Sequence, residues 1–201
     1  MIYIKTRKSN YEFFGDRQSF ITQEILNYST SSSTIQVNTS DNMNNHFSIT
    51  FSSGYGSGVL CPNTGMYFNN SLGEIELNPQ GFLGETHDDR LISNMSPLII
   101  ESDDGITTIG SPGADRISSA IAQVLLNYSK NNNWKHAIDE PRFHVNGDGT
   151  VRAEPGSLDA GKNITITESY DMYFGGVCVS GFNNKVFSHG DKRRGDTSWT
   201  S

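Results

Sequence analysis

A short segment of small residues, Gly110-Ser111-Pro112-Gly113-Ala114, has the composition of an anion-binding turn. It follows a predicted strand at 107–109 and precedes Asp115, a typical N-cap for the amphipathic pattern that comes next. The first backbone N–H groups of a helix have no partner within the helix, and the helix dipole gives them partial positive charge. A turn that leads into such a helix end can hold an anion, or the oxyanion that develops during acyl transfer.

The residues after this turn predict one clear helix. Over 115–128, six side chains recur at helical spacing and share one face: Ile117, Ala120, Ile121, Val124, Leu125 and Tyr128. Residues 17–28 also show helical spacing, and they lead into a Ser/Thr-rich run at 29–33 that is typical of a solvated linker. The predicted helix at 115–128 would begin directly at the anion-binding turn.

Most other apolar residues predict strands. Apolar and polar residues alternate at 35–37 and 47–51, on either side of the polar segment 42–45, which is typical of a hairpin. Further strands are predicted at 66–68, 98–101, 107–109, 164–167 and 174–179. Strands with an inserted helix, and without a repeating strand–helix unit, indicate an antiparallel α+β protein.

The composition argues against several classes of protein. The chain has 201 residues and a net charge of −7, and its basic residues are scattered apart from Lys192-Arg193-Arg194, so a nucleic-acid-binding surface is not expected. This length favours one domain. Cys61 and Cys178 are predicted to be free buried thiols, with a single disulfide as the alternative. The 5 histidines share no metal-ligand spacing, so we expect no metal and no other cofactor.

The chain shows no segment that predicts a membrane span or export. No apolar run approaches the roughly 18 residues that a membrane-spanning helix needs. Residues 1–8 carry charges without the apolar core of a signal peptide after them. For the chain as given we therefore expect a cytoplasmic location, and the native compartment stays open.

Several motifs, in order along the chain, resemble those of the small subunit of gamma-glutamyltransferases. Thr64-Gly65-Met66-Tyr67-Phe68-Asn69-Asn70-Ser71-Leu72-Gly73-Glu74 is similar to the family's Thr-Gly-Ile-x-Leu-Asn-Asn-x-Met/Leu-x-Asp/Glu, which ends on a carboxylate. Ser93-Asn94-Met95-Ser96-Pro97 is similar to Ser-Ser-Met-Ser-Pro, and the turn at 110–114 is similar to Gly-Ser-Pro-Gly-Gly. Segments 48–53, 56–58 and 190–195 match further motifs, and an ordered set is more specific than any one motif.

This resemblance implies the fold of the N-terminal nucleophile hydrolases, an αββα four-layer sandwich in which two antiparallel sheets lie between helical layers. The chain would supply the small-subunit half. Residues 1–29 would be the end of a large-subunit-like segment and a linker, and 30–201 would be the small-subunit-like domain. Because the family's active site takes a substrate-binding Arg from the large subunit, the resemblance also implies a large-subunit-like partner chain.

The resemblance implies substrate-binding roles for residues of two motifs. The Glu74 carboxylate would bind the α-amino group of a γ-glutamyl substrate, and Asn70 precedes it at the family's spacing. Without the resemblance, Glu74 is expected to be an exposed loop carboxylate. Ser93 and Asn94 would hold the substrate α-carboxylate, or they would simply cap the turn before Pro97.

The same resemblance makes the turn an oxyanion hole. Its donors would be the backbone amides of Gly113 and Ala114, which together would contribute roughly 3 kcal/mol or more to transition-state binding. Ala114 replaces the second glycine of the family motif. This replacement keeps the N–H group but restricts the backbone angles. Without the resemblance, Gly113 is a turn glycine before a capped helix.

The nucleophile implied by the resemblance is Thr30, which self-cleavage would place at a new N-terminus. Such a residue offers a hydroxyl and an α-amine with a pKa near about 8 that can accept its proton. Residue type favours Thr30, the alternation of the following strand favours Ser32, and Ser31 lies between them. The His that follows the nucleophile in the family is absent, and Ser52 would support the nucleophile from the second strand.

Together these features predict γ-glutamyl transfer or hydrolysis on glutathione-like γ-glutamyl amides, through a γ-glutamyl-enzyme ester. Acylase activity on another amide is an alternative within the same fold. The alternative from another class is a non-catalytic truncated or split-gene subunit that binds a large-subunit-like partner. The missing His and the replacement at Ala114 are compatible with this last alternative.

Overall fold

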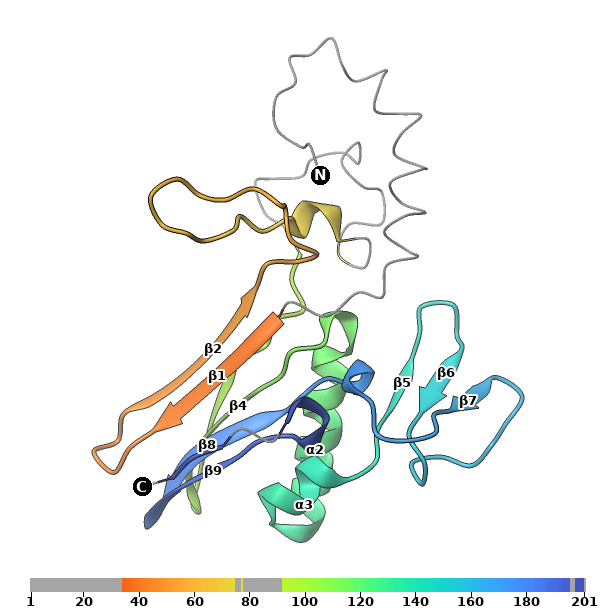
Figure 1. Cartoon of the computed structure of the whole chain (residues 1–201). Helices are drawn as coiled ribbons and strands as arrows, with labels where there is room; N and C mark the ends of the chain where they lie inside the picture. Colours follow the sequence, from red (N-terminus) through yellow and green to blue (C-terminus); the bar gives the residue numbers. More distant parts are fainter. Residues whose placement is uncertain (1–33, 75–76, 78–91, 196–197, 201) are drawn as a thin grey trace. The chain divides into compact units, whose positions relative to one another are not determined.

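A computed structural model of the chain describes residues 34–74, 77, 92–195 and 198–200. The chain divides into two compact units, of which one holds residues 1–33 and 52–91 and the other holds residues 34–51 and 92–201. The larger unit contains most of the secondary structure (Figure 1). Each unit is described by itself below.

A four-stranded antiparallel sheet forms the centre of the larger unit. Its strands are β3 (Leu98–Ser102), β4 (Gly105–Gly110), β8 (Cys178–Asn183) and β9 (Lys185–His189), in the order β3-β4-β8-β9. Leu98 pairs with Ile109, and Gly110 pairs with Cys178. This register brings the segment before β3, the segment after β4 and the segment before β8 to the same end of the sheet. The sequence turn at 111–114 leaves the sheet at that end.

Two helices, α2 (Ile117–Asn131) and α3 (Trp134–Asp139), pack on one face of this sheet (Figure 1). The helical periodicity at 115–128 is confirmed, because its first four apolar residues are buried in the core. The buried core consists of Ile109, Ile117, Ala120, Ile121, Val124, Trp134, Ala137, Ile138, Val177 and Val179. Burial of this apolar surface is the main force that fixes the helices against the sheet.

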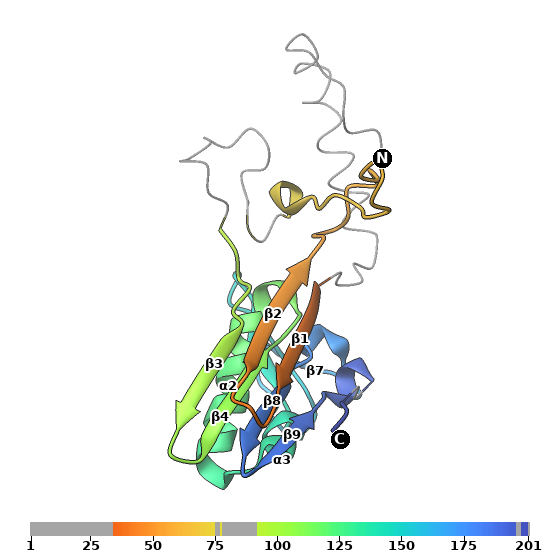
Figure 2. The ribbon, with the colours of Figure 1, turned by 90° about the vertical axis from the view of Figure 1, so that its left-hand side faces the viewer.

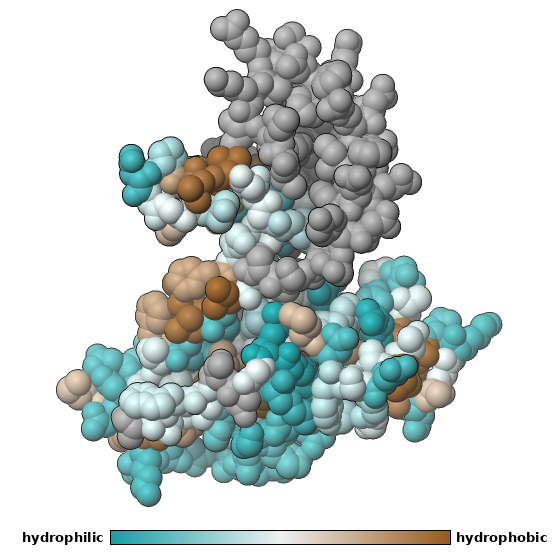
Figure 3. Space-filling view, viewed as in Figure 1, coloured by the Kyte–Doolittle hydropathy of each residue, from teal (hydrophilic) through white to brown (hydrophobic). Residues whose placement is uncertain are grey.

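A two-stranded sheet, β1 (Thr34–Ser40) with β2 (His46–Ser52), lies against β4 and β8 (Figure 2). The predicted hairpin is therefore confirmed. Its inner face is polar: the Asn38 amide donates to the Cys178 carbonyl at 2.7 Å, and the Ser48 hydroxyl donates to the Ile109 carbonyl at 3.2 Å. Its apolar residues point outward, and Figure 3 shows this apolar surface over β1 and β2; it contains the exposed residues Ile35, Val37, Phe47 and Phe51.

A third, small sheet completes the larger unit. It contains β5 (Phe143–Val145), β6 (Val151–Ala153) and β7 (Ile164–Ile166); β5 and β6 pair antiparallel, whereas β6 and β7 pair parallel. The smaller unit has little regular structure in its described residues. The strand predicted at 66–68 is there a single bridge between Leu60 and Tyr67.

Two expected boundaries differ from the structure. Asp115 is not the N-cap of the helix: residues Ala114–Arg116 form a 3-10 turn, and α2 begins at Ile117 after Arg116. The segment 174–179 is not one strand, because Phe174 ends a 3-10 turn and β8 begins at Cys178. In both places a glycine with positive φ, Gly113 or Gly175, interrupts the regular backbone.

Other expectations have mixed outcomes. Both cysteines are free, as predicted, but both are half-buried rather than buried. The helix predicted at 17–28 lies outside the described residues. Within the ranges that the structure describes, no helix is both long and apolar enough to cross a bilayer. In the same ranges, no three His, Cys, Asp or Glu side chains cluster as metal ligands would.

Candidate active site

The turn after β4 has an unusual backbone. Gly113 has a φ of +140°, and Ala114 has a φ of +51°. For an alanine, the left-handed region costs about 1 kcal/mol or more, because Cβ approaches the following carbonyl oxygen. The Arg116 amide donates to the Gly113 carbonyl at 2.9 Å and closes the turn. A strained turn of this kind persists where its surroundings hold it in place.

Ser111 and the two glycines before β8, Gly175 and Gly176, pack against the turn and fix its position. The Ser111 hydroxyl is fully buried, donates to the Pro112 carbonyl at 2.6 Å and accepts from the Gly176 amide at 3.1 Å. A Cβ at Gly113 would lie 3.0 Å from the Gly175 Cα, and a Cβ at Gly175 would lie 2.8 Å from the Ser111 hydroxyl oxygen. Side chains larger than hydrogen therefore do not fit where the two segments meet.

Asp115 connects the turn to the small sheet instead of capping the helix. Its carboxylate pairs with Arg116 and lies 3.6 Å from Nε2 of the buried His144. The Ser119 hydroxyl contacts His144 Nδ1 at 3.0 Å. Burial lowers the pKa of His144, the charge of Arg116 lowers it further, and Asp115 partly opposes both effects. The imidazole is thus held neutral beside the turn.

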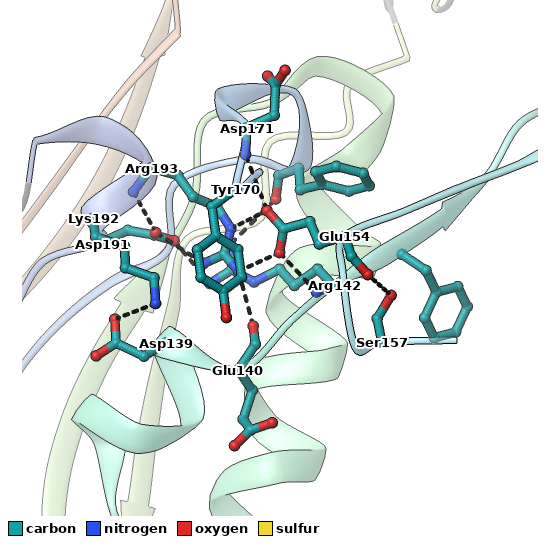
Figure 4. Close-up of polar contacts among 12 residues, drawn as sticks. Asp139, Glu140, Arg142, Glu154, Ser157, Tyr170, Asp171, Asp191, Lys192 and Arg193 are labelled. Carbon is teal, nitrogen blue, oxygen red and sulfur yellow. Dashed lines mark hydrogen bonds and ion pairs between the residues drawn. The ribbon is translucent and has the colours of Figure 1, made fainter. Parts of the chain in front are cut away.

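A buried ion network contacts the segment before β8 at Val177, and Figure 4 shows its members. It contains two arginines and two carboxylates, so its net charge is zero: Arg142, Arg193, Glu154 and Asp191. The Glu154 carboxylate accepts from Arg193 Nε at 2.7 Å and Nη2 at 2.5 Å, and from the Arg142 backbone amide at 2.9 Å. Asp191 contacts Arg142 Nη2 at 2.8 Å and Arg193 Nη1 at 3.1 Å.

This network explains what the basic segment near the end of the chain does. Arg193 is buried, although the sequence places it in a charged run at 192–194. Burial lowers the pKa of Arg142 and Asp191 partly opposes this effect, whereas for Arg193 the carboxylates outweigh burial and raise the pKa. Asp191 also accepts from the Val177 amide at 2.9 Å, which joins the network to the segment before β8.

Residues predicted to bind the substrate amine come together in the smaller unit. Glu74 is 8% exposed, so the expectation of an exposed loop carboxylate is wrong. A Cβ at Gly54 would lie 2.6 Å from Asn70 Oδ1 and 2.8 Å from Glu74 Oε1, which puts both side chains against the glycine turn. Asn70 Oδ1 accepts from the Tyr55 amide at 2.6 Å. Ser52 Oγ accepts from the Gly54 amide at 3.1 Å in the same turn.

Ser93 and Asn94 lie in the larger unit, before β3. Ser93 Oγ accepts from the Met95 amide at 3.1 Å, and the Asn94 carbonyl accepts from the Ser96 hydroxyl at 3.0 Å. These bonds cap a local turn. The β3–β4 register brings this turn to the same sheet end as Gly113. Their role in holding a substrate carboxylate stays a prediction.

The predicted nucleophile Thr30 and its neighbours Ser31 and Ser32 lie outside the described residues. Among the described residues, Thr34 is a further candidate for the nucleophile, because it is the first residue of β1 and is buried. Sequence reasoning missed it, although the alternation of β1 contains the signal. Thr34 lies on the same face of β1 as Gln36, whose side chain faces the central sheet. Ile35 and Val37 lie on the opposite, exposed face.

Comparison with known proteins assigns the chain to a family. The model of the family described as gamma-glutamyltranspeptidase matches residues 4–165. The glutathione hydrolase proenzyme of Bacillus subtilis (strain 168) is 33% identical over 104 residues, which are 51% of this chain and 18% of that protein. The matched part of the chain thus spans about a fifth of this relative.

Solved structures share the fold. The transpeptidase enzyme CapD of Bacillus anthracis superimposes with a TM-score of 0.65 at 22% identity, over 83% of this chain and 99% of that chain. A mutant of the gamma-glutamyltranspeptidase of Helicobacter pylori gives a TM-score of 0.62 at 24% identity, over 79% and 98% of the two chains. The α+β architecture is that of the N-terminal nucleophile hydrolases, and the chain belongs to the gamma-glutamyltranspeptidase family.

Proposed function

We propose that this chain carries the nucleophile and the oxyanion hole of an enzyme that hydrolyses or transfers γ-glutamyl amides. The observation that carries the proposal is that Thr34, a buried residue at the start of β1, lies on a strand that packs against β4, and β4 leads into the strained Gly113–Ala114 turn. Acyl transfer through an ester needs both groups within reach of one carbonyl carbon. Thr30, Ser31 and Ser32 stay sequence predictions, and the geometry of the described residues favours Thr34.

The position of Thr34 follows from the contacts of β1. Asn38 accepts from the Ser48 hydroxyl, which also contacts the Ile109 carbonyl, and the Gln36 side chain overlaps the place where a Cβ of the next residue, Gly110, would be. Moving along β1 from Asn38 to Gln36 therefore leads toward the end of β4. Thr34 is two residues further, about 6.6 Å along an extended strand. Its hydroxyl thus belongs beyond Gly110, level with the turn.

The chemistry needs the peptide bond between Ser33 and Thr34 to be hydrolysed first. The freed α-amine, with a pKa of about 8, accepts the hydroxyl proton while Oγ1 attacks the γ-carbonyl carbon of the substrate. The amides of Gly113 and Ala114 donate to the oxyanion. Collapse returns the proton to the leaving amine and gives a γ-glutamyl ester, which water or an acceptor amine cleaves.

Two pairs of residues bind the substrate in this proposal. Glu74, placed beside Asn70, would pair with the α-ammonium group, and Ser93 with Asn94 would bind the α-carboxylate. The burial of Glu74 supports its role, because a buried carboxylate gains most from a positively charged partner.

A large-subunit-like partner chain is part of the proposal. The chain matches 18% of a curated relative named a proenzyme, yet it matches 99% and 98% of two solved chains of the same fold. These proportions are those expected when a long precursor is cut into two chains. The exposed apolar face of β1 and β2 also supports a partner, because such faces mark interaction surfaces.

The test is the mass and the N-terminus of the product. The full chain is expressed with the large-subunit-like reading frame upstream of its gene, or alone if there is none, as wild type, Thr34→Ala and Thr30→Ala. We expect a new N-terminus at Thr34 in wild type and in Thr30→Ala but not in Thr34→Ala, together with hydrolysis of a γ-glutamyl anilide.

Two other outcomes separate the parts of this proposal. A new N-terminus at Thr30, Ser31 or Ser32 with anilide hydrolysis would keep the function and reject Thr34. An uncut wild-type chain without activity would reject the catalytic function and favour the non-catalytic subunit.

A further inference from the structure

The geometry points to Ser111 as a positioning residue of the oxyanion hole: we infer that its hydroxyl holds the Gly113–Ala114 turn in the shape that exposes both amides to an oxyanion. This inference rests on the proposed function for its catalytic consequence. Its structural part, that Ser111 fixes the turn, can be tested without activity.

The turn needs an external support. The φ of +51° at Ala114 costs free energy that the backbone bonds of the turn, from the Arg116 amide to the Gly113 carbonyl and from the Ile117 amide to the Ala114 carbonyl, only help to offset. Backbone strain is maintained at functional sites only where neighbouring groups over-determine the conformation. The question is which group does so.

Ser111 has the contacts of such a group. It lies two residues before Gly113 and is 0% exposed, so water does not replace its bonds. Its one hydroxyl joins two segments that are 65 residues apart, because it donates to the Pro112 carbonyl and accepts from the Gly176 amide. The Gly175 Cα then lies directly against the place of a Gly113 Cβ.

The segment on the other side of this hydroxyl is itself fixed. The Val177 amide donates to Asp191, which belongs to the buried ion network. The Arg194 side chain fills the space where a Cβ of Gly176 would be. Ser111 therefore connects the glycine-containing turn to the segment before β8, which the ion network holds in place.

The matched pair of variants is Ser111→Ala and Thr108→Val. Thr108 is also 0% exposed, lies three residues earlier on β4, and donates its hydroxyl to the Ser180 carbonyl at 2.9 Å. Both changes remove a buried hydroxyl: Ser111→Ala leaves the Pro112 carbonyl and the Gly176 amide without that partner, and Thr108→Val leaves the Ser180 carbonyl without it. A purely structural role predicts a loss of stability in both variants and no selective loss of kcat in either.

With the proteolytically processed enzyme, we expect Ser111→Ala to lower kcat roughly 10- to 100-fold and to leave KM within about twofold, because an oxyanion contact is made only in the transition state. A boronate analogue of glutamate, which forms a tetrahedral adduct with a hydroxyl nucleophile, should lose affinity by a similar factor. Thr108→Val should change neither kcat nor this affinity by more than about twofold.

Hydrogen exchange of the full chain provides the readout without activity. Ser111→Ala should speed exchange of the Arg116 amide and of its neighbours in the turn, relative to both wild type and Thr108→Val. Unchanged kcat and unchanged exchange in Ser111→Ala would overturn the inference. If the wild type is inactive, the proposed function fails. Faster exchange in Ser111→Ala that is confined to the turn would still show that Ser111 supports the turn.

Discussion

Replacing Glu154 by glutamine tests whether the buried ion network determines the stability of the larger unit. Glu154 is 0% exposed, and its carboxylate receives bonds from Arg193, Arg142 and Asp171. Glutamine has nearly the same shape, but it removes one negative charge and turns one acceptor oxygen into a donor. The amide would then face N–H groups, and the network would keep one buried positive charge in excess.

The expected magnitude follows from burial. Removing one partner of a buried ion pair costs about 3 to 5 kcal/mol, since the remaining charge stays out of water. For a chain of this size each kcal/mol lowers the melting temperature by about 2 to 4 °C, so we expect a decrease of roughly 6 to 20 °C. The ordinary cost of a lost surface ion pair is below about 1 kcal/mol.

The assay is urea unfolding followed by circular dichroism, with Asp139→Asn as the matched control. Asp139 lies near Lys192 at 4.0 Å and is partly exposed, so its loss should cost less than about 1 kcal/mol. The reasoning would be refuted if Glu154→Gln destabilised the chain by less than about 1 kcal/mol, or no more than the control does.

Two further predictions concern titrating side chains. Burial raises the pKa of Cys178 to about 11, so at a pH of about 8 only about one Cys178 thiol in a thousand is ionised. Iodoacetamide should therefore modify Cys178 at least about tenfold more slowly than Cys61, and peptide mass measures both rates. For His144 the native pKa is lowered from 6.5 by burial, so the unfolded chain takes up a proton first as the pH falls. Stability should therefore decrease below a pH of about 6.5, and the decrease should be smaller in His144→Gln; equal pH profiles in urea unfolding would contradict this.

Local patterns predicted the helix and the hairpin correctly because their signals come from neighbours in sequence. The spacing of Ile117, Ala120 and Ile121 defines one face of α2, whatever that face contacts. The three-residue strands β5 and β6 were not predicted, because segments so short carry almost no periodicity. The N-cap prediction at Asp115 was wrong because its carboxylate pairs with the neighbouring Arg116 and lies beside His144, which is distant in the sequence.

Buried charges were the least predictable part of the candidate site. Glu154 lies between β6 and a turn at 155–157. Nothing in the local sequence shows that this carboxylate is buried with Arg193, which comes 39 residues later. Charged side chains are almost always exposed unless they are paired, so a pattern read locally assigns them to the surface. Their pairing depends on the assembled fold.

The hairpin shows a further limit, and it bears on function. Alternation in β1 and β2 tells which residues share a face but not which face packs inside. Here the polar face, with Gln36 and Asn38, meets the central sheet, whereas Ile35 and Phe47 point outward. An inner layer of hydrogen-bonded amides and hydroxyls is a poor hydrophobic core, but it lies on the same face of β1 as Thr34, the proposed nucleophile. The arrangement leaves the apolar face of the hairpin exposed, where the proposed partner chain would bind, and places polar groups on the face that the proposed nucleophile shares.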